Sequence, residues 1–349
     1  MRTWAEISLP RLVQNYANIR AAVGSSVAVA GVVKANAYGH GAIPVSHALV
    51  EAGAEWLAVS NVAEGIELRR AGIGVRILVM GGVLPPEREE LVQHKLTPVV
   101  HSLEELGEWD VLGGPPVHLK IDTGMARLGM RGEPTAIAAA ISALRQVHVE
   151  GLMSHFATPS DPVQSEAQLV LFEQVLHLVR PEVVHFASSF AIAERLRGAW
   201  LTLVRPGIAL YGYAPVCDVK PVLTWKARVL GVKHLPKGAA VGYNARYQAP
   251  RDIRMAVIAA GYADGMPRAL TNNGQIEIGG QLAPIIGAVS MDLTTIDVTD
   301  CGPIQIGDEA AIIGERITAD DVARAAGTIS YEILTGIGNR VQRVYSKAR

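Results

Sequence analysis

The sequence lacks several features that would place it in common classes of protein. It has only two cysteines, Cys217 and Cys301, which show no CxxC spacing and form no metal-binding set. Two such cysteines cannot make a disulfide framework, and this is typical of a reducing compartment. No apolar run approaches membrane-spanning length, and the N-terminus MRTWAEISL has no apolar signal-peptide core. We therefore expect a cytoplasmic protein that does not insert into a membrane.

Charge is also scarce, and its two signs are balanced. Charged residues make up 19% of the 349 residues, and the formal net charge is -1. No long basic run is present, so neither nucleic acid nor an anionic membrane is an expected partner. Hydrophobic residues make up 49%, which allows a sizeable core and excludes wholesale disorder. A chain of this length suits one large domain and one smaller domain.

The first two thirds of the chain alternate short β-rich runs with amphipathic segments. Eight strand–helix units in about 200 residues predict a (β/α)8 TIM-type barrel over residues 1–220. An open doubly wound sheet remains the alternative, because weak strands are easily miscounted. The expected strands are 27–33, 56–60, 76–80, 97–100, 117–121, 149–154, 183–185 and 202–205. Between them, the expected helices are 43–51, 63–70, 134–146 and 163–178.

The pattern changes after Tyr213. Residues 221–349 contain short β-rich runs separated by glycine-rich turns, which predicts a separate, mostly β C-terminal domain. The N-terminal few residues are expected to pair with this domain. A stretch rich in proline and glycine, 206–221, is the expected hinge region. The expected elements of this domain are strands at 227–233, 255–260, 275–278, 294–298 and 310–313 and a helix at 319–326.

The decamer VVKANAYGHG (32–41) places Lys34 at the end of an apolar run. A lysine that closes a buried strand is desolvated, and desolvation lowers the pKa of an amine. The uncharged amine forms Schiff bases with aldehydes such as pyridoxal phosphate (PLP). An ordinary strand-end lysine more often extends into water. The polar and glycine-rich residues that follow Lys34 favour the chemical interpretation.

The barrel prediction places several polar side chains at one end of the barrel. Active sites of such barrels form at the C-terminal ends of the strands. Four residues follow expected strands: Lys34, His155, Ser188 and Ser189. Arg205 closes the last expected strand, and Arg127 lies just past the fifth. In VRPGIALYG (204–212), Gly207 and Ile208 offer backbone N–H groups where phosphate often binds in these barrels. The alternatives are a rim ion pair for Arg205 and a satisfied core histidine for His155.

These motifs resemble those of the alanine racemases. VVKANAYGHG resembles their cofactor-lysine motif, and VRPGIALYG resembles the motif whose arginine hydrogen-bonds the pyridine nitrogen of PLP. The match runs from RTWAEISLPRLVQNYANIR to ISYEILTGIGNRVQRVY, essentially end to end. It implies that Lys34 carries PLP and that Arg205 faces the pyridine nitrogen. It also implies that the phosphate is held by the Tyr38 hydroxyl, Ser189 and the amides of Gly207 and Ile208.

The resemblance further implies racemisation of L-alanine and D-alanine by two bases. One base is needed on each face of a planar carbanion, and Lys34 can serve only one face. The run GYADG (261–265) matches the motif whose tyrosine, here Tyr262, is the second base and comes from the partner subunit of a homodimer. His155 would lie behind Tyr262, link to Arg205 and help to lower the pKa of the phenol. Taken alone, Tyr262 would be read as a turn residue.

Three further matches concern the substrate. Arg127 resembles the arginine that binds the substrate carboxylate or supports the phenolic oxygen of the cofactor. Lys120 matches a lysine that is often carbamylated and orients that arginine. Met291 matches the partner-subunit methionine whose amide contacts the substrate carboxylate. The implied role is supply of D-alanine for peptidoglycan.

Alternatives within and beyond this family remain open. A PLP-binding carrier on the same barrel would lack the second domain. A decarboxylase of the same fold would have an acidic residue in place of Arg205. An arginine at this position donates a hydrogen bond to the pyridine nitrogen without protonating the ring. Asn339 stands where many members have a larger residue. We hypothesise that it widens the entrance, as in a racemase of broader specificity; turnover of alanine alone, and not of serine or lysine, would disprove this.

Overall fold

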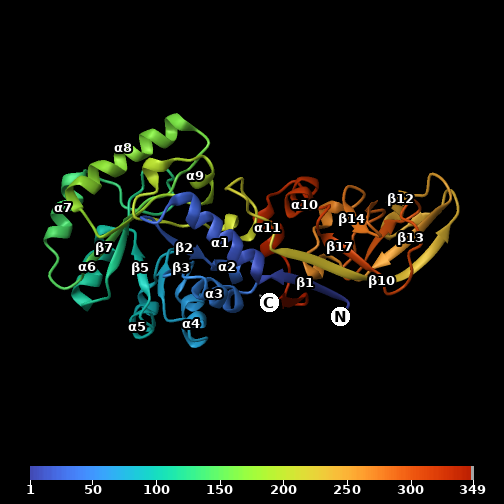
Figure 1. Cartoon of the computed structure of the whole chain (residues 1–349), viewed down its shortest axis with the longest axis horizontal. Coiled ribbons are helices and arrows are strands. Elements are labelled where there is room, and N and C mark those ends of the chain that lie inside the picture. Colours follow the sequence, from blue (N-terminus) through green and yellow to red (C-terminus); the bar gives the residue numbers. More distant parts are fainter. Residues whose placement is uncertain (347–349) are drawn as a thin grey trace. The chain divides into compact units, whose positions relative to one another are not determined.

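The computed structural model describes residues 1–346, and the chain divides into two compact units (Figure 1). The barrel unit comprises Leu12–Ala37 and Ala42–Lys220. The β unit comprises Met1–Arg11, Tyr38–Gly41 and Pro221–Arg349. Two short segments from the first part of the chain therefore belong to the β unit.

Eight parallel strands form the centre of the barrel unit. Their spatial order is β8-β7-β6-β5-β4-β3-β2-β9. The strands are β2 (Ala28–Val32), β3 (Trp56–Val59), β4 (Arg76–Val79), β5 (Thr97–Val100), β6 (Val117–Lys120), β7 (Val149–Met153), β8 (Val183–His185) and β9 (Leu203–Val204). Most end one or two residues inside their expected bounds, and β5 and β8 have the expected bounds.

The two ends of this sheet meet at β8 and β9, so the sheet is nearly closed. Thr202 N–H donates to the Val184 carbonyl (3.1 Å), and Arg205 N–H donates to the Ala187 carbonyl (2.9 Å). An isolated parallel bridge joins Ser188 to Arg205. The barrel prediction is confirmed, and the open doubly wound sheet was the wrong alternative.

Helices follow the strands and lie around the outside of the barrel (Figure 1). Side-chain caps mark the starts of α4 and α6: Asn61 accepts from Glu64 N–H (2.9 Å), and Ser102 accepts from Glu105 N–H (3.0 Å). The helices are α1 (Leu9–Val23), α2 (Lys34–Tyr38), α3 (Ala42–Glu51), α4 (Val62–Arg70), α5 (Arg88–Gln93), α6 (Leu103–Leu112), α7 (Pro134–Ser142), α8 (Pro162–Val179) and α9 (Ser189–Ala193).

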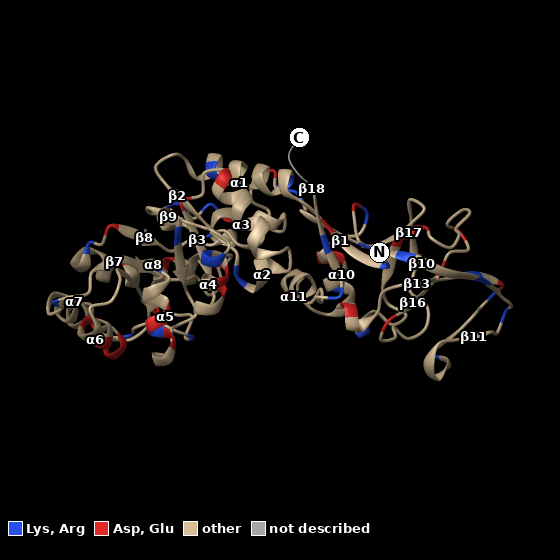
Figure 2. Cartoon of the chain, turned by 90° about the horizontal axis from the view of Figure 1, so that it is seen from below, with Lys and Arg blue, Asp and Glu red and all other residues tan. Residues whose placement is uncertain are grey.

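The core of the barrel unit lies on and between its strands. Every residue of β3, β6 and β7 is buried, as expected for parallel strands that are covered on both faces. Polar side chains are enclosed with the apolar ones, among them His118, Glu150 and His185. On the outer helices and loops, residues of both charge signs are interspersed (Figure 2).

The β unit is built around β10 (Leu223–Leu235), which pairs with β1 (Thr3–Ser8), β13 (Ile253–Ile258) and β17 (Glu309–Ile313). Strand β1 also pairs in parallel with β18 (Gln342–Ser346). The remaining elements are β11 (Ala240–Val241), β12 (Tyr247–Gln248), β14 (Gln275–Ile278), β15 (Gln281–Pro284), β16 (Thr294–Asp297), α10 (Ala319–Ala326) and α11 (Ser330–Thr335). The mostly β character of this part is confirmed. Within residues 1–346, no helix combines the length and apolarity needed to span a bilayer.

Candidate active site

Lys34 begins α2, a single turn with left-handed backbone geometry. The three residues after Lys34 have φ angles of 52–53°, and left-handed geometry costs about 1–2 kcal/mol for each residue other than glycine. Two hydrogen bonds hold the turn: Ala35 N–H donates to Glu64 Oε1 (2.7 Å), and Ala42 N–H donates to Asn36 Oδ1 (2.7 Å). Strain of this kind collects at functional sites. Here it fixes the direction in which the chain leaves β2.

The Lys34 amine is half-buried, and its charged form is disfavoured. Burial lowers the pKa of Lys34, the positive charge of Arg127 lowers it further, and Glu64 opposes the shift. More neutral amine is therefore present than for a lysine in water. The neutral amine is the form that attacks an aldehyde.

Arg205 follows β9 directly and is 3% exposed. Its Nη1 donates to His185 Nδ1 (2.7 Å), and its Nη2 donates to the carbonyl oxygens of Ser154 (2.8 Å) and Phe186 (3.2 Å). Burial lowers the pKa of Arg205 to about 9, so the side chain remains a cation at neutral pH. Within residues 1–346 it pairs with no carboxylate, and its Nε donates to no other residue. The Nε–H is thus available to a ligand.

His155 lies two residues after β7 and is neutral. Arg205 Nη2 donates to His155 Nδ1 at 3.4 Å, near the outer limit of a hydrogen bond. Burial lowers the pKa of His155 to about 3, with further contributions from the positive charges of Arg205 and Lys120. A neutral imidazole that accepts at Nδ1 carries its proton on Nε2. His155 therefore offers an N–H donor rather than a positive charge.

The Ser189 hydroxyl lies beside the turn η3 (Ile208–Tyr211). Its Oγ accepts from the N–H groups of Gly207 (3.0 Å) and Ala209 (3.2 Å). Since these two bonds use both lone pairs of the oxygen, the hydroxyl proton remains to be donated. The Ile208 N–H donates to no other residue in the described part of the chain. Two donors without a protein acceptor are therefore held close together after β8 and β9.

Lys120 and Arg127 add positive charge to the same end of the barrel. Lys120 is the last residue of β6 and is 5% exposed. Burial lowers its pKa to about 8, and Arg127 and Arg205 contribute while Asp122 opposes the shift. Asp122 also shapes the loop that carries the exposed Arg127, because its Oδ1 accepts from Ala126 N–H (3.0 Å). Four cations, Lys34, Lys120, Arg127 and Arg205, thus influence one another.

In the β unit, Tyr262 and Met291 lie on adjoining turns. Tyr262 N–H donates to the Ser290 carbonyl (3.0 Å), and Ala263 N–H donates to the Met291 carbonyl (2.9 Å). The close approach of the two turns requires glycine at position 261, since a Cβ on Gly261 would lie 2.4 Å from the Ser290 and Met291 carbonyl oxygens. Tyr262 is 44% exposed and Met291 is 53% exposed. Both side chains are presented on the surface of this unit.

Asp264 and Arg340 hold these turns together, and sequence reasoning missed both. The buried Asp264 accepts from Gly261 N–H through Oδ2 (3.0 Å), and Arg340 Nε lies 3.2 Å from its Oδ1. Arg340 Nη2 also donates to Asp292 Oδ1 (2.8 Å). One arginine thus links the GYADG turn to the turn that contains Met291. The sequence signal that could have found this link is an aspartate in each turn: Asp264 in GYADG and Asp292 directly after Met291.

Tyr38 belongs to the β unit. Its ring centroid lies 5.8 Å from that of Tyr331, and the side chain is 6% exposed. Burial raises the pKa of the Tyr38 phenol. The hydroxyl therefore keeps its proton at neutral pH and remains a donor.

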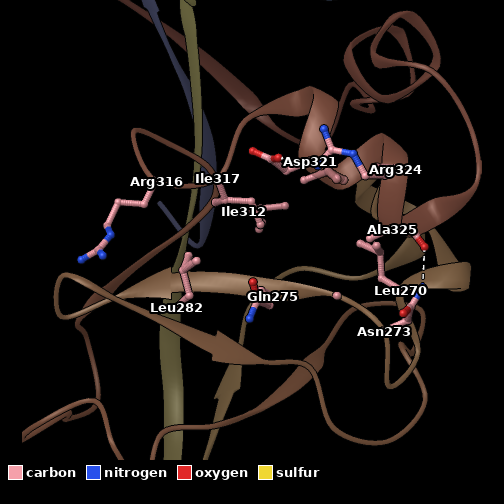
Figure 3. Close-up of a pocket in the computed structure, with 12 residues that line it drawn as sticks. Leu270, Asn273, Gln275, Leu282, Ile312, Arg316, Ile317, Asp321, Arg324 and Ala325 are labelled. Atoms are coloured by element: carbon pink, nitrogen blue, oxygen red, sulfur yellow. Dashed lines mark hydrogen bonds and ion pairs between the residues drawn. The ribbon is translucent and has the colours of Figure 1, made fainter.

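The structure gathers the candidate residues in two groups. The barrel group contains Lys34, Lys120, Arg127, His155, Ser189, Arg205, Gly207 and Ile208. The β-unit group contains Tyr38, Tyr262 and Met291. A separate pocket of about 420 Å³ in the β unit, lined by residues such as Leu282, Ile312 and Arg324, includes none of these candidates (Figure 3).

Two family models cover almost the whole chain. Residues 7–215 match the N-terminal domain of alanine racemase, and residues 222–345 match its C-terminal domain. Together, the fold, the two groups of residues and these matches define an isomerase built from a barrel and a β unit. The chain belongs to the alanine racemase family, as the motifs predicted.

Relatives and solved structures agree over the full length. The chain is 42% identical to the alanine racemase of Halothermothrix orenii, over 98% of this chain and 96% of the relative. The crystal structure of alanine racemase from Streptomyces lavendulae superposes with a TM-score of 0.93 at 34% identity, covering 100% and 98% of the two chains. Alanine racemase from Bartonella henselae, solved with covalently bound pyridoxal phosphate, gives a TM-score of 0.92 at 31% identity, covering 99% and 100%.

Proposed function

We propose that the chain interconverts L-alanine and D-alanine with PLP as its cofactor, and that two bases, Lys34 and Tyr262, move the proton. The observation that supports this best is the gathering of Lys34, Lys120, Arg127 and Arg205 at one end of the barrel. PLP carries a phosphate and a phenolic oxygen, and an amino acid carries a carboxylate. A cluster of cations with spare donors suits these anionic groups.

The donors of the barrel unit fit PLP. The Ser189 hydroxyl and the Ile208 N–H would bind the phosphate, and Gly207 would contribute by orienting Ser189. The Tyr38 hydroxyl would add a further donor. Arg205 would donate through Nε to the pyridine nitrogen, and the Lys34 amine would hold the cofactor covalently.

Bound PLP supplies an electron sink that makes the α-proton of alanine acidic enough to remove. Lys34 would take or return this proton on the D-alanine side, and Tyr262 would do so on the L-alanine side. Because a guanidinium does not give up its proton, Arg205 would leave the pyridine nitrogen unprotonated. With less negative charge delocalised into the ring, prompt return of the proton would be favoured over side reactions. His155 would act on Tyr262 through its Nε2–H donor.

The substrate carboxylate would be held by Arg127 and by the Met291 amide. Lys120, with its pKa lowered to about 8, has a larger neutral fraction than a lysine in water, and the neutral amine is the form that attacks CO2. Such a reaction forms an N–C bond, releases one proton to solvent and leaves a carbamate anion that would orient Arg127. A carbamate signal in the 13C NMR spectrum, obtained with labelled bicarbonate and absent from Lys120→Ala, tests this modification.

Tyr262 and Met291 would reach the substrate from the partner subunit of a homodimer. Their exposure on adjoining turns of the β unit supports this arrangement. Each dimer would then contain two composite sites. The reaction would supply D-alanine for peptidoglycan synthesis.

Visible absorption and coupled detection of D-alanine test the assignment of both bases. Lys34→Ala should abolish the visible band of the lysine-bound cofactor. Tyr262→Phe should keep this band but lower racemisation by roughly 10²- to 10⁴-fold, the usual contribution of a general base. Tyr243→Phe, at a tyrosine of the same unit that is 72% exposed, is the matched control and should change neither. A band that persists in Lys34→Ala, or full turnover by Tyr262→Phe, would refute the proposal.

A further inference from the structure

A chain of polar contacts runs from Arg205 through the interior of the barrel unit. Arg205 Nη1 donates to His185 Nδ1 (2.7 Å), and His185 Nε2 lies 2.7 Å from His118 Nδ1. His118 Nε2 faces Glu150 Oε2 at 3.5 Å, and Glu150 Oε1 accepts from Arg76. We call these five residues the histidine relay. It extends from the C-terminal ends of the strands, at Arg205, to the N-terminal start of β4, at Arg76.

The positions of the protons in the relay follow from its first donor. A guanidinium can only donate, so His185 Nδ1 must accept, and the proton of His185 must lie on Nε2. That proton points at His118 Nδ1, which must accept in turn. A doubly protonated His118 would set two N–H donors against each other at 2.7 Å. His118 is therefore also neutral, with its proton on Nε2, directed at Glu150.

Packing holds the His118 ring in this orientation. The ring centroid lies 5.4 Å from that of Trp56 and 4.8 Å from that of His185. A Cβ at Gly151 would lie 2.5 Å from the His118 ring, so glycine leaves the ring its place. The Arg76 guanidinium in turn lies over the Trp56 ring, 4.8 Å from its centroid. These contacts restrain the ring against turning over, which would exchange its donor and acceptor.

The charged groups around the relay are consistent with two neutral histidines and an ionised Glu150. Arg205 and His118 face His185, while Glu150, Arg205 and Arg76 act on His118. Burial lowers the pKa values of both histidines. The His118 imidazole, 3.5 Å away, and the charge of Arg76 lower the pKa of Glu150, while burial opposes the shift. Glu150 is thus an anion at neutral pH, separated from Arg205 by two neutral imidazoles.

We propose that His118 and Glu150 are positioning residues for Arg205, with Glu150 serving as its remote counter-charge through two imidazoles locked in one tautomer. The relay holds the Arg205 guanidinium in one orientation. It does so without placing a carboxylic acid beside the pyridine nitrogen to which Arg205 Nε would donate. Such an acid could protonate a pyridine nitrogen, which Arg205 cannot do. The benefit to catalysis rests on the proposed function, whereas the tautomers depend on this chain alone.

The tautomers can be measured by 15N NMR of histidine-labelled protein at neutral pH. We expect both His118 and His185 to show a protonated Nε2 and an unprotonated Nδ1. The signals are assigned with His118→Gln and His185→Gln. A protonated Nδ1 or an imidazolium at either residue would overturn the relay, whether or not the protein racemises alanine.

Glu150→Gln tests the counter-charge, because it keeps an acceptor for His118 and removes the negative charge. We expect kcat in both directions to fall on the order of 10-fold, with KM unchanged and the cofactor absorption band shifted, since small displacements of catalytic groups are costly. The control is Glu182→Gln, which alters an exposed carboxylate that lies 3.3 Å from His148 and should change neither quantity. A wild-type kcat and spectrum in Glu150→Gln would refute the counter-charge, and lack of any racemisation by the unaltered protein would refute the proposed function instead.

Discussion

Three histidines of the barrel unit, His118, His155 and His185, are neutral because burial disfavours their charged forms. In the unfolded chain they would titrate at their ordinary pKa of 6.5. As the pH falls below 6.5, the unfolded state therefore binds protons that the folded state does not. The contribution of these histidines to the free energy of unfolding is fully present above pH 6.5. It decreases as the pH falls from 6.5 to the folded pKa, which is about 3 for His155.

This linkage predicts how stability depends on pH. Each buried histidine should lower the free energy of unfolding by about 1.4 kcal/mol per pH unit below its unfolded pKa. Urea unfolding midpoints between pH 7 and pH 5 measure the slope. His118→Gln should give a shallower slope than the unaltered protein, whereas His148→Gln, at an exposed histidine, should not. A midpoint that rises as the pH falls would contradict the neutral assignment.

Single residues could be predicted from the sequence where their position along a strand decides their place. Lys34 directly follows an expected strand and Arg205 closes another, and the barrel rule puts such residues at one end. Asp264 and Glu150 could not be found in this way. Their importance comes from Arg340 and His118, which are distant in sequence, and only the tertiary structure shows these pairs.

At the scale of elements, periodicity located the strands of the barrel better than those of the β unit. Strands such as β3 are short apolar runs between clear helical segments, so their pattern is distinct. The two-residue strands β11 and β12 are too short to show any alternation. Strand β10 was expected only over 227–233 but spans Leu223–Leu235, because pairing with β1, β13 and β17 extends it at both ends. The left-handed turn α2 depends on Glu64 and Asn36 and has no periodic signature.

The turn that presents Tyr262 provides a prediction at this scale. Gly261→Ala places a methyl group against the Ser290 and Met291 carbonyl oxygens, so the turn must shift. We expect racemisation to fall by roughly 100-fold, the effect of about 1 Å of misplacement, with the visible cofactor band retained. Gly231→Ala is the matched control, since its Cβ would meet nothing within 4 Å. Equal kcat values for the two variants would show that the turn does not position the base.

At the scale of the whole molecule, the two units do not follow the simple order of the chain. The segments Met1–Arg11 and Tyr38–Gly41 belong to the β unit, although Tyr38–Gly41 closely follows the first expected strand of the barrel. The reason is long-range pairing: Trp4 lies opposite Gln342 in the β1–β18 ladder, and Arg343 Nε donates to the Gly39 carbonyl (3.0 Å). Contacts across some 300 residues leave no local signal.

Each unit holds part of the proposed chemistry, with the lysine in the barrel unit and the tyrosine in the β unit. The central claim is that a productive site combines Lys34 of one copy with Tyr262 of another. A site contained within one copy would need no exchange of subunits.

The most direct measurement of this claim is complementation between two inactive variants. Lys34→Ala and Tyr262→Phe are mixed in equal amounts, unfolded and refolded together, and assayed for racemisation. If the site is shared, half of the dimers are mixed and each contains one intact site, so activity should recover to about a quarter of that of the unaltered protein treated alike. Recovery no greater than the sum of the two variants refolded separately would contradict the shared site.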